Sequence, residues 1–129
     1  MIIVDTSALM AIIMKEPEAQ RCAAVLGSEP DLAISAGTVA EAMIVAGGRQ
    51  LARDMERLIT ETGMEIAPVT PALSWRVAEA YARWGKGYHR AGLNFGDCFA
   101  YAEAKARSCP LLFVGEDFKQ TDLASALSP

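Results

Sequence analysis

The sequence predicts an α/β fold, a three-layer α/β/α sandwich built on a mainly parallel sheet. Short apolar runs rich in strand-forming residues stand at 2–4 and 111–114, and they suit strands that are buried on both faces. Between these runs, strand-like segments alternate with helix-like ones, the pattern of right-handed βαβ crossovers. The chain has 129 residues, 52% of them hydrophobic, so residues 1–129 are expected to form a single domain with one core.

The elements of the first half follow from caps, breakers and apolar spacing. The predicted strands are 2–4 and 32–35, and the predicted helices are 7–14, the segment from Pro17 to Gly27, the segment from Thr38 to Gly48, and 49–62. Proline is favoured at the first position of a helix and glycine just after the last. Thr38 and Glu41 have the spacing of a capping box, which places Glu41 in the first turn of its helix.

The second half continues the alternation. The predicted elements are a strand at 65–69, a helix at 71–84, a basic loop at 85–93, a helix at 95–107 and a strand at 111–114. Pro68 weakens the first of these strands, because proline cannot donate to a ladder and prefers a sheet edge or a strand end. Asn94 is expected to cap the helix that follows it.

Composition limits the compartment more than the partner. No apolar run approaches the roughly 20 residues that span a bilayer, no basic region precedes the apolar start, and three unpaired cysteines favour a reducing cytoplasm. The net charge of −4 argues against a nucleic-acid partner on its face. However, bound metal ions neutralise acids, so the total charge alone does not decide the partner.

Four acids stand where parallel-sheet geometry brings strand ends and helix starts to the same edge. They are Asp5, Glu41, Asp97 and Asp117. Ligand sites of open α/β sheets form at the carboxyl ends of the strands. Clustered carboxylates repel one another unless a cation or protons neutralise them, and an all-oxygen ligand set suits Mg²⁺ or Mn²⁺. The four acids are therefore candidate metal ligands.

Each acid also has a purely structural interpretation. The first three all stand near a helix N-terminus, where a carboxylate satisfies free N–H groups, and Glu41 in particular fits its capping box. Asp117 is also readable as an ordinary turn residue. Its neighbours Glu116 and Asp122 remain open as alternatives for the fourth acid.

Three segments and one helix together resemble the PIN domain, and more narrowly a VapC-type toxin ribonuclease. The segments are IVDTSAL at 3–9, LNFGDCFAYA at 93–102 and LLFVGEDFKQTD at 111–122, and the helix is the one that carries Glu41. The resemblance covers the whole chain, and the acids come in the family's order. Its first and last motifs are specific, whereas the Glu41 motif is loose.

The resemblance implies an Mg²⁺- or Mn²⁺-dependent endoribonuclease, the toxin of a type II toxin–antitoxin pair. A metal-activated water would cut the RNA phosphodiester and leave a 5′-phosphate and a 3′-hydroxyl. Asp5 and Asp97 would be the principal metal ligands, and Glu41 and Asp117 would complete the acidic site. Thr6 or Ser7 is expected either to orient a water or to cap a helix.

The resemblance also implies a cognate antitoxin and a homodimer through the early helices. Leu9, Ile12, Ile13 and the face formed by 22–26 are either that interface or ordinary core.

A basic stretch before Asp97 is the expected RNA-binding element. Arg83, Lys86, His89 and Arg90 are interleaved with aromatic residues, and no acid lies between Glu79 and Asp97. Basic side chains neutralise phosphates, and aromatic rings stack on unpaired bases. The alternative is that about half of the aromatic residues belong to the core and that His89 is an ordinary surface residue.

Two other functions fit part of the sequence. A phospho-acceptor signalling domain has a similar length and acidic pocket, but it needs an aspartate at the end of a central strand. The interior strands are expected to end at Ser35 and Val69, which argues against this function. A catalytically inactive PIN-like module that binds RNA or protein is the second alternative. The complete set of four acids argues against loss of activity.

Overall fold

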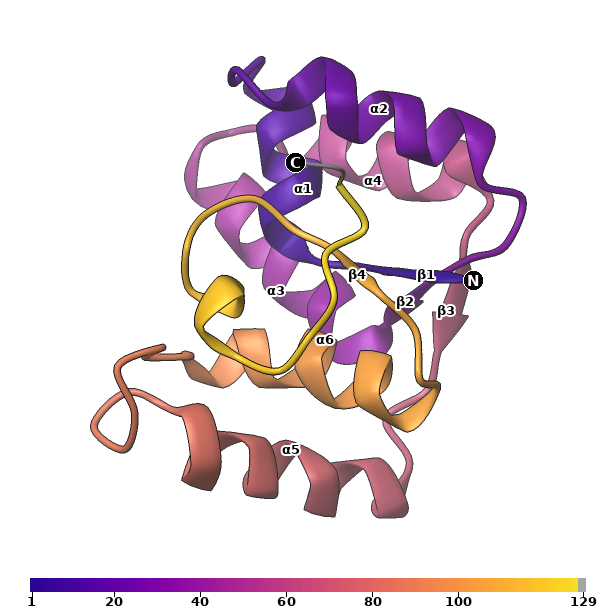
Figure 1. Ribbon diagram of the computed structural model, residues 1–129. Helices are drawn as coiled ribbons and strands as arrows, with labels where there is room; N and C mark the ends of the chain where they lie inside the picture. The colour runs from indigo at the N-terminus through magenta and orange to yellow at the C-terminus, as the bar shows by residue number, and fades with distance from the viewer. Residues whose placement is uncertain (128–129) are drawn as a thin grey trace.

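A four-stranded parallel sheet forms the centre of the protein in the computed structural model, which describes residues 1–127 (Figure 1). The strands are β1 (Ile2–Val4), β2 (Leu32–Ser35), β3 (Glu65–Ala67) and β4 (Leu111–Leu112). Their order is β3-β2-β1-β4, and each neighbouring pair is parallel. The predicted α/β class and parallel sheet are confirmed.

Helices cover both faces of this sheet and form the outer layers. They are α1 (Thr6–Ile13), α2 (Ala19–Ser28), α3 (Ala36–Gly48), α4 (Ala52–Thr62), α5 (Pro71–Trp84) and α6 (Phe95–Ala106), followed by a short 3-10 turn, η1 (Phe118–Gln120). Ile3 packs on the side of α5 and α6, whereas Val4 packs on the side of α1, α3 and α4. The two faces of β1 therefore contribute to two cores, as its continuous apolar sequence predicts.

The start of α3 differs from the prediction. Ser35 is the N-cap, and its hydroxyl accepts a hydrogen bond from Gly37 N at 3.2 Å. The predicted capping box of Thr38 and Glu41 is wrong, because the helix has already begun two residues before Thr38. Glu41 thus lies in the second turn rather than the first, and its carboxylate is not needed as a cap.

The sheet order also corrects the argument against a phospho-acceptor domain. β3 is an edge strand that ends at Ala67, so Val69 does not follow an interior strand. The interior strands are β1 and β2, and Asp5 follows β1 directly. Strand ends therefore do not exclude that function.

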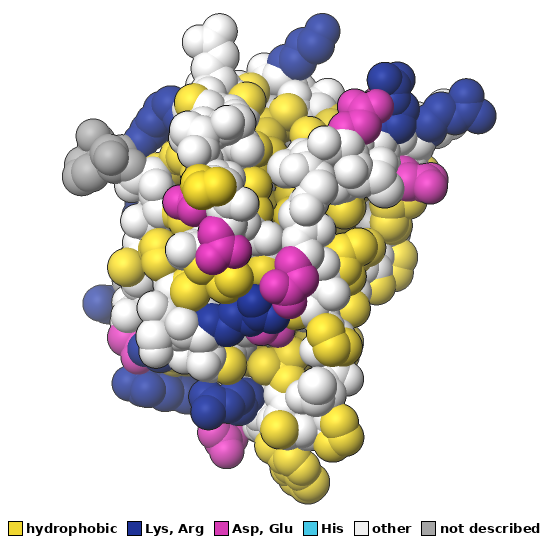
Figure 2. Space-filling model, turned by 90° about the vertical axis from the view of Figure 1, so that its right-hand side faces the viewer, with side chains coloured by type: hydrophobic (Ala, Val, Ile, Leu, Met, Phe, Trp, Pro, Cys, Tyr) yellow, Lys and Arg dark blue, Asp and Glu magenta, His cyan; other side chains and the backbone are white. Residues whose placement is uncertain are grey.

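Ion pairs tie the sheet to α6 at the end opposite the carboxyl ends of the strands. Arg107 donates to Glu65 on β3 at 2.7 Å and to the buried Glu103 on α6 at 2.7 Å. Figure 2 shows the face on this side, where acidic and basic side chains are intermingled. Because opposite charges alternate there, this face carries no large field of one sign.

A chain of hydrogen bonds fastens the tail, residues 121–127, to α5 and α6. The Trp84 indole N–H donates to the Tyr101 hydroxyl at 2.8 Å, and that hydroxyl donates to Asp122 at 2.6 Å. Lys105 pairs with the same carboxylate at 3.2 Å.

Among residues 1–127, no helix is long and apolar enough to cross a membrane.

We expect Tyr101→Phe to lower the free energy of unfolding by about 1–3 kcal/mol, because the buried Trp84 N–H loses its acceptor. Urea denaturation measures the change. Tyr88→Phe is the matched control: Tyr88 is 68% exposed, and its ring contact with Tyr81 needs no hydroxyl, so a change below about 0.5 kcal/mol is expected. Equal losses in the two variants would contradict the role of the hydrogen-bond chain.

Candidate active site

The four predicted acids come from four parts of the chain that meet at the carboxyl ends of the strands. Asp5 follows β1, Glu41 lies in α3, Asp97 lies in the first turn of α6, and Asp117 immediately precedes η1. The left side of Figure 1 shows this edge, where the loop before α6 and the loop after β4 also lie. The predicted convergence at one edge is present in the fold.

Asp5 is the central acid, because it is 2% exposed and stands at the end of an interior strand. Its Oδ2 accepts hydrogen bonds from Ser7 N at 3.0 Å and from the Ser7 hydroxyl at 2.7 Å. Its Oδ1 is buried and has no hydrogen-bond partner among residues 1–127. Asp5 is thus the N-cap of α1 through Oδ2, while its Oδ1 makes no hydrogen bond. The role as a helix cap and the expected role as a metal ligand are therefore compatible.

Ser7 links Asp5 to the segment that follows β4. Its hydroxyl accepts a hydrogen bond from Val114 N at 3.0 Å while donating to Asp5. Thr6 donates its hydroxyl to Glu41 Oε1 at 2.6 Å. Since Asp5 is the N-cap, neither hydroxyl caps α1; each one holds a carboxylate of the acid cluster instead.

Gly96 allows α6 to approach Glu41 closely. A Cβ at position 96 would overlap the Glu41 carboxylate, so a larger residue would displace that carboxylate from its position beside α6. Gly37 and Phe99 make a similar close contact between α3 and α6. Sequence reasoning did not single out either glycine as functional, although glycine inside a helix costs stability and is a signal of close packing.

Asp97 has two roles, like Asp5. It forms a capping box with Asn94: Asp97 N donates to Asn94 Oδ1 at 2.8 Å, and Asn94 N donates to Asp97 Oδ2 at 3.0 Å. The predicted cap at Asn94 is confirmed. The N-terminus of α6 also favours negative charge at this position.

Asp117 is the best-placed of the three candidates for the fourth acid, because its charge raises the pKa of Asp97. Asp122 is held by Tyr101 and Lys105 on the α5–α6 layer. Glu116 is exposed and pairs with Lys119 at 2.8 Å.

The electrostatic cost of the cluster appears in two pKa values. Burial raises the pKa of Asp5 to about 7, against the opposing hydrogen bonds from Ser7, and the charges of Asp97 and Glu41 add to the increase. Burial also raises the pKa of Asp97 to about 6, and the charges of Glu41 and Asp117 contribute. These carboxylates therefore destabilise one another in the absence of a cation.

The donor set fits a hard divalent cation, although the side chains are not gathered into a closed cage. Within residues 1–127, no three His, Cys, Asp or Glu side chains form a group that could hold a metal ion. Mg²⁺ needs less than that, since it usually keeps several waters and uses one or two carboxylates. The buried Oδ1 of Asp5 without a partner, beside Asp97 and Glu41, meets this smaller requirement.

The basic loop is ordered around its aromatic residues. His89 is half-buried: its Nδ1 accepts a hydrogen bond from Ala91 N at 3.0 Å, and its ring lies 4.7 Å from that of Trp84. Arg83 lies over the Trp84 ring and 3.7 Å from Asp122. Lys86 and Arg90 are exposed. Two of the four expected RNA-binding residues thus have structural contacts, and the prediction itself stays untested.

Comparisons with known proteins agree with this geometry. The sequence model of the family described as PIN domain matches residues 2–123. The chain is 46% identical to ribonuclease VapC36 of Mycobacterium tuberculosis, over 94% of this chain and 90% of the relative.

Two solved structures share the fold. One is VapC20 of M. tuberculosis, described as a sarcin-ricin loop cleaving toxin, with a TM-score of 0.81, 17% identity, and coverage of 99% of this chain and 100% of that one. The other is a toxin–antitoxin complex from Klebsiella pneumoniae, with a TM-score of 0.69, 20% identity, and coverage of 95% and 93%.

The raised pKa values predict a pH dependence of stability in metal-free protein. A carboxyl whose pKa is higher in the folded state than in the unfolded state contributes stability at low pH, and this contribution is lost as the pH rises through the folded value. For Asp5 the loss falls between about pH 4 and pH 7, and each raised unit corresponds to about 1.4 kcal/mol. The unfolding free energy of the wild type minus that of Asp5→Asn should therefore decrease as the pH rises through this window.

Urea denaturation in EDTA at pH 4.5, 6 and 8 measures that difference. Asp54→Asn is the control for loss of a single carboxyl, because Asp54 is exposed on α4 and is not one of the four acids. Added Mg²⁺ should stabilise the wild type more at pH 8 than at pH 4.5. A constant difference for Asp5→Asn would refute the proposed electrostatic cost at this position.

Proposed function

Because the chain belongs to the PIN-domain family and to its VapC ribonuclease branch, we propose that it is a divalent-metal-dependent endoribonuclease. In this proposal it is the toxin of a type II toxin–antitoxin pair. The observation that carries the proposal is the buried Oδ1 of Asp5, which lies among acids and lacks a partner. A catalytically inactive binding module would have no need to maintain so costly a group.

Each side chain has a defined part in this proposal. Asp5 and Asp97 hold Mg²⁺ or Mn²⁺, and Glu41 and Asp117 complete the negative site. A divalent ion, when bound, supplies an activated water and neutralises charge on the phosphodiester. Thr6 and Ser7 act through the carboxylates, since their hydroxyl protons are donated to Glu41 and Asp5. We treat both as positioning residues.

RNA contacts in the basic loop belong to Lys86 and Arg90 in this proposal. Their side chains are exposed, and the loop that carries them runs into the first turn of α6, where Asp97 lies. Arg83 and His89 instead keep the loop folded against Trp84. Tyr88 is 68% exposed and is the aromatic ring best placed to stack on an unpaired base.

Two partners belong to the proposed function. The first is a cognate antitoxin, in line with the toxin–antitoxin complex that shares the fold. The second is another copy of the chain. The cytoplasm is the proposed site of action, consistent with free thiols at Cys22, Cys98 and Cys109.

The interface of the homodimer is proposed at a different place from the one expected. Leu9 and Cys22 are fully buried within the chain, so those two residues belong to the core. Ile12 and Ile13 are half-buried and 23–24 is exposed, so that part of the expected interface stays an untested prediction. An apolar groove between α3 and α6 is exposed instead, and it is lined by Gly37, Ala40, Glu41, Ile44, Val45, Phe95, Gly96 and Phe99. Since Glu41 stands in this groove, a second copy docked there would lie beside the acid cluster.

Purified protein should cleave single-stranded RNA with Mg²⁺ or Mn²⁺ and should lose this activity in EDTA. Asp5→Ala and Asp97→Asn should each reduce kcat/KM by about 100-fold or more, because removing a charged group from a preorganised site costs at least this much. Gel analysis of end-labelled RNA measures the rate and identifies the 5′-phosphate and 3′-hydroxyl products.

Asp117→Asn and Glu116→Gln form a matched pair of neighbouring variants. We expect a clear loss of activity for the first and less than a twofold change for the second, because Glu116 is 75% exposed and, unlike Asp117, is not among the charges that raise the pKa of Asp97. Folded Asp5→Ala protein that cuts as fast as the wild type would refute the proposed site. RNA binding without cleavage under all metal conditions would favour the inactive module.

Ile44→Glu should convert the dimer to a monomer, because it places a charge in the apolar groove at a side chain that is 76% exposed in the monomer. Trp75→Glu is the matched control: Trp75 is 73% exposed on α5, outside the groove. Light scattering coupled to size-exclusion chromatography measures the mass. A wild-type monomer, or a dimer that survives Ile44→Glu, would contradict this interface.

A further inference from the structure

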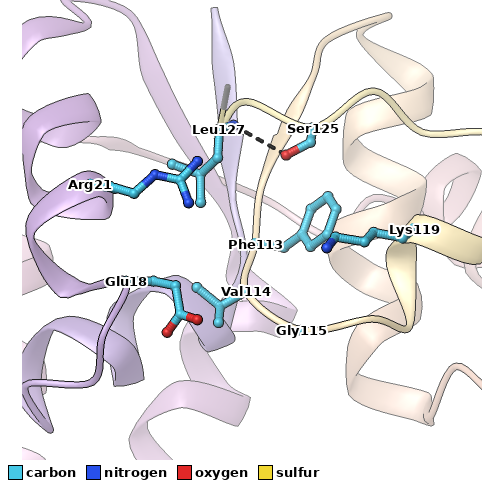
Figure 3. Close-up of a pocket in the computed structure, with 8 residues that line it drawn as sticks. All are labelled: Glu18, Arg21, Phe113, Val114, Gly115, Lys119, Ser125 and Leu127. Carbon is cyan, nitrogen blue, oxygen red and sulfur yellow. Dashed lines mark hydrogen bonds between the residues drawn. The ribbon is translucent and has the colours of Figure 1, made fainter. Parts of the chain in front are cut away.

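A cleft next to the acid cluster has no role in the function described so far. It has a volume of about 430 Å³ and is lined by Glu18, Arg21, Phe113, Val114, Gly115, Lys119, Ser125 and Leu127. Four parts of the chain build its walls: α2, the end of β4, η1 and the tail. Figure 3 shows Arg21 on one side of the cleft and Lys119 on the other, with Phe113 and Val114 between them.

The cleft shares a wall with the acid site. Val114 N donates to the Ser7 hydroxyl, and that hydroxyl donates to Asp5, so two hydrogen bonds connect the cleft wall to the central acid. The loop after β4 continues from Gly115, which lines the cleft, to Asp117, whose charge acts on Asp97. The segment that lines the cleft therefore also positions Asp5, through Ser7, and carries Asp117.

The lining combines positive charge with an apolar floor. Arg21 and Lys119 face the acid Glu18, which leaves one net positive charge. Lys119 also pairs with Glu116, but both side chains are more than 60% exposed, and such pairs contribute little. Phe113 lies beneath the floor, 3% exposed and packed 5.3 Å from the ring of Phe118, so the half-buried Val114 and Leu127 supply the accessible apolar lining.

The size and chemistry of this cleft fit a nucleotide better than a second metal ion or a purely apolar ligand. Its volume falls in the range of small-molecule sites, roughly 300–1,000 Å³. Cations at two walls suit a phosphate, and apolar side chains between them suit a ribose and a base. The protein carries a net charge of −4 and gathers acids at its reactive centre, so a polyanionic substrate needs cations close to that centre.

We propose that this cleft binds one unpaired nucleotide of the RNA substrate next to the phosphodiester that is cut. Lys119 and Arg21 pair with its phosphate, and the half-buried side chains of Val114 and Leu127 contact its sugar and base. The inference rests on the proposed ribonuclease function and adds a subsite to it. Both cations act on substrate binding and not on the chemical step, so their loss raises KM and leaves kcat unchanged.

The test compares two double variants that remove the same charge. Arg21→Ala/Lys119→Ala removes the two cations of the cleft, whereas Arg53→Ala/Arg57→Ala removes two exposed cations from α4; each changes the net charge from −4 to −6. Arg57 pairs with Glu61 much as Lys119 pairs with Glu116, so the control also breaks an exposed ion pair. Lys119→Glu is a third variant that reverses a single charge.

Fluorescence anisotropy of a labelled single-stranded RNA in EDTA measures binding without cleavage over a series of NaCl concentrations. The cleft double variant should bind about tenfold more weakly, and its log–log salt slope should fall by about 0.7 for each cation removed. With Mg²⁺ present, its KM should rise by a similar factor at unchanged kcat. The α4 double variant should change affinity by less than twofold.

Two results would overturn the subsite while leaving the ribonuclease function intact. In the first, wild type cleaves RNA and the cleft variants, Lys119→Glu included, keep its affinity and KM. In the second, both double variants lose affinity equally, so that only total charge matters. Wild-type protein that cleaves no RNA with either metal ion refutes the proposed function instead, and the subsite fails with it.

Discussion

The burial of a carboxylate among other acidic side chains is the constraint on which the rest of the structure depends. Asp5 is buried at the end of an interior strand, with its charge close to those of Asp97 and Glu41. Such a cluster is held by the surrounding fold, since the carboxylates alone would separate. β1 supplies this support because its two faces are packed in two different cores, so Asp5 cannot move without disturbing both.

The fold gives several side chains a structural and a chemical task at once. Asp5 and Asp97 both satisfy helix N-termini with one oxygen, and this bond fixes the orientation of each carboxylate. Ser7 extends the arrangement by joining Asp5 to the backbone of Val114. A helix cap and the proposed role as a metal ligand are therefore compatible, because one oxygen of Asp5 meets the helix end while its Oδ1 has no hydrogen-bond partner among residues 1–127.

The sequence was sufficient for the sheet class and for the order of the acids, and it failed where competing local signals had similar strength. Thr38 and Glu41 matched a capping box, but Ser35 stands earlier and takes the cap, which frees Glu41. The position of β3 at the sheet edge was not readable, since strand order depends on long-range packing. The role of Gly96 was equally hidden, because it depends on a contact with Glu41, which lies far away in the sequence.

Charge separation explains how a chain with net negative charge suits a polyanionic substrate. The acids are concentrated at the carboxyl ends of the strands, where burial makes their negative charge costly and a bound cation would offset it. Cations stand around that point on other elements, with Arg21 on α2, Lys119 on η1, and Lys86 on the loop before α6. In the proposed function these cations attract the RNA phosphates on either side of the cut, and a bound metal ion would neutralise the acids at the centre. Binding and cleavage are then controlled by different residues, which is why substitutions around the site should affect KM and kcat separately.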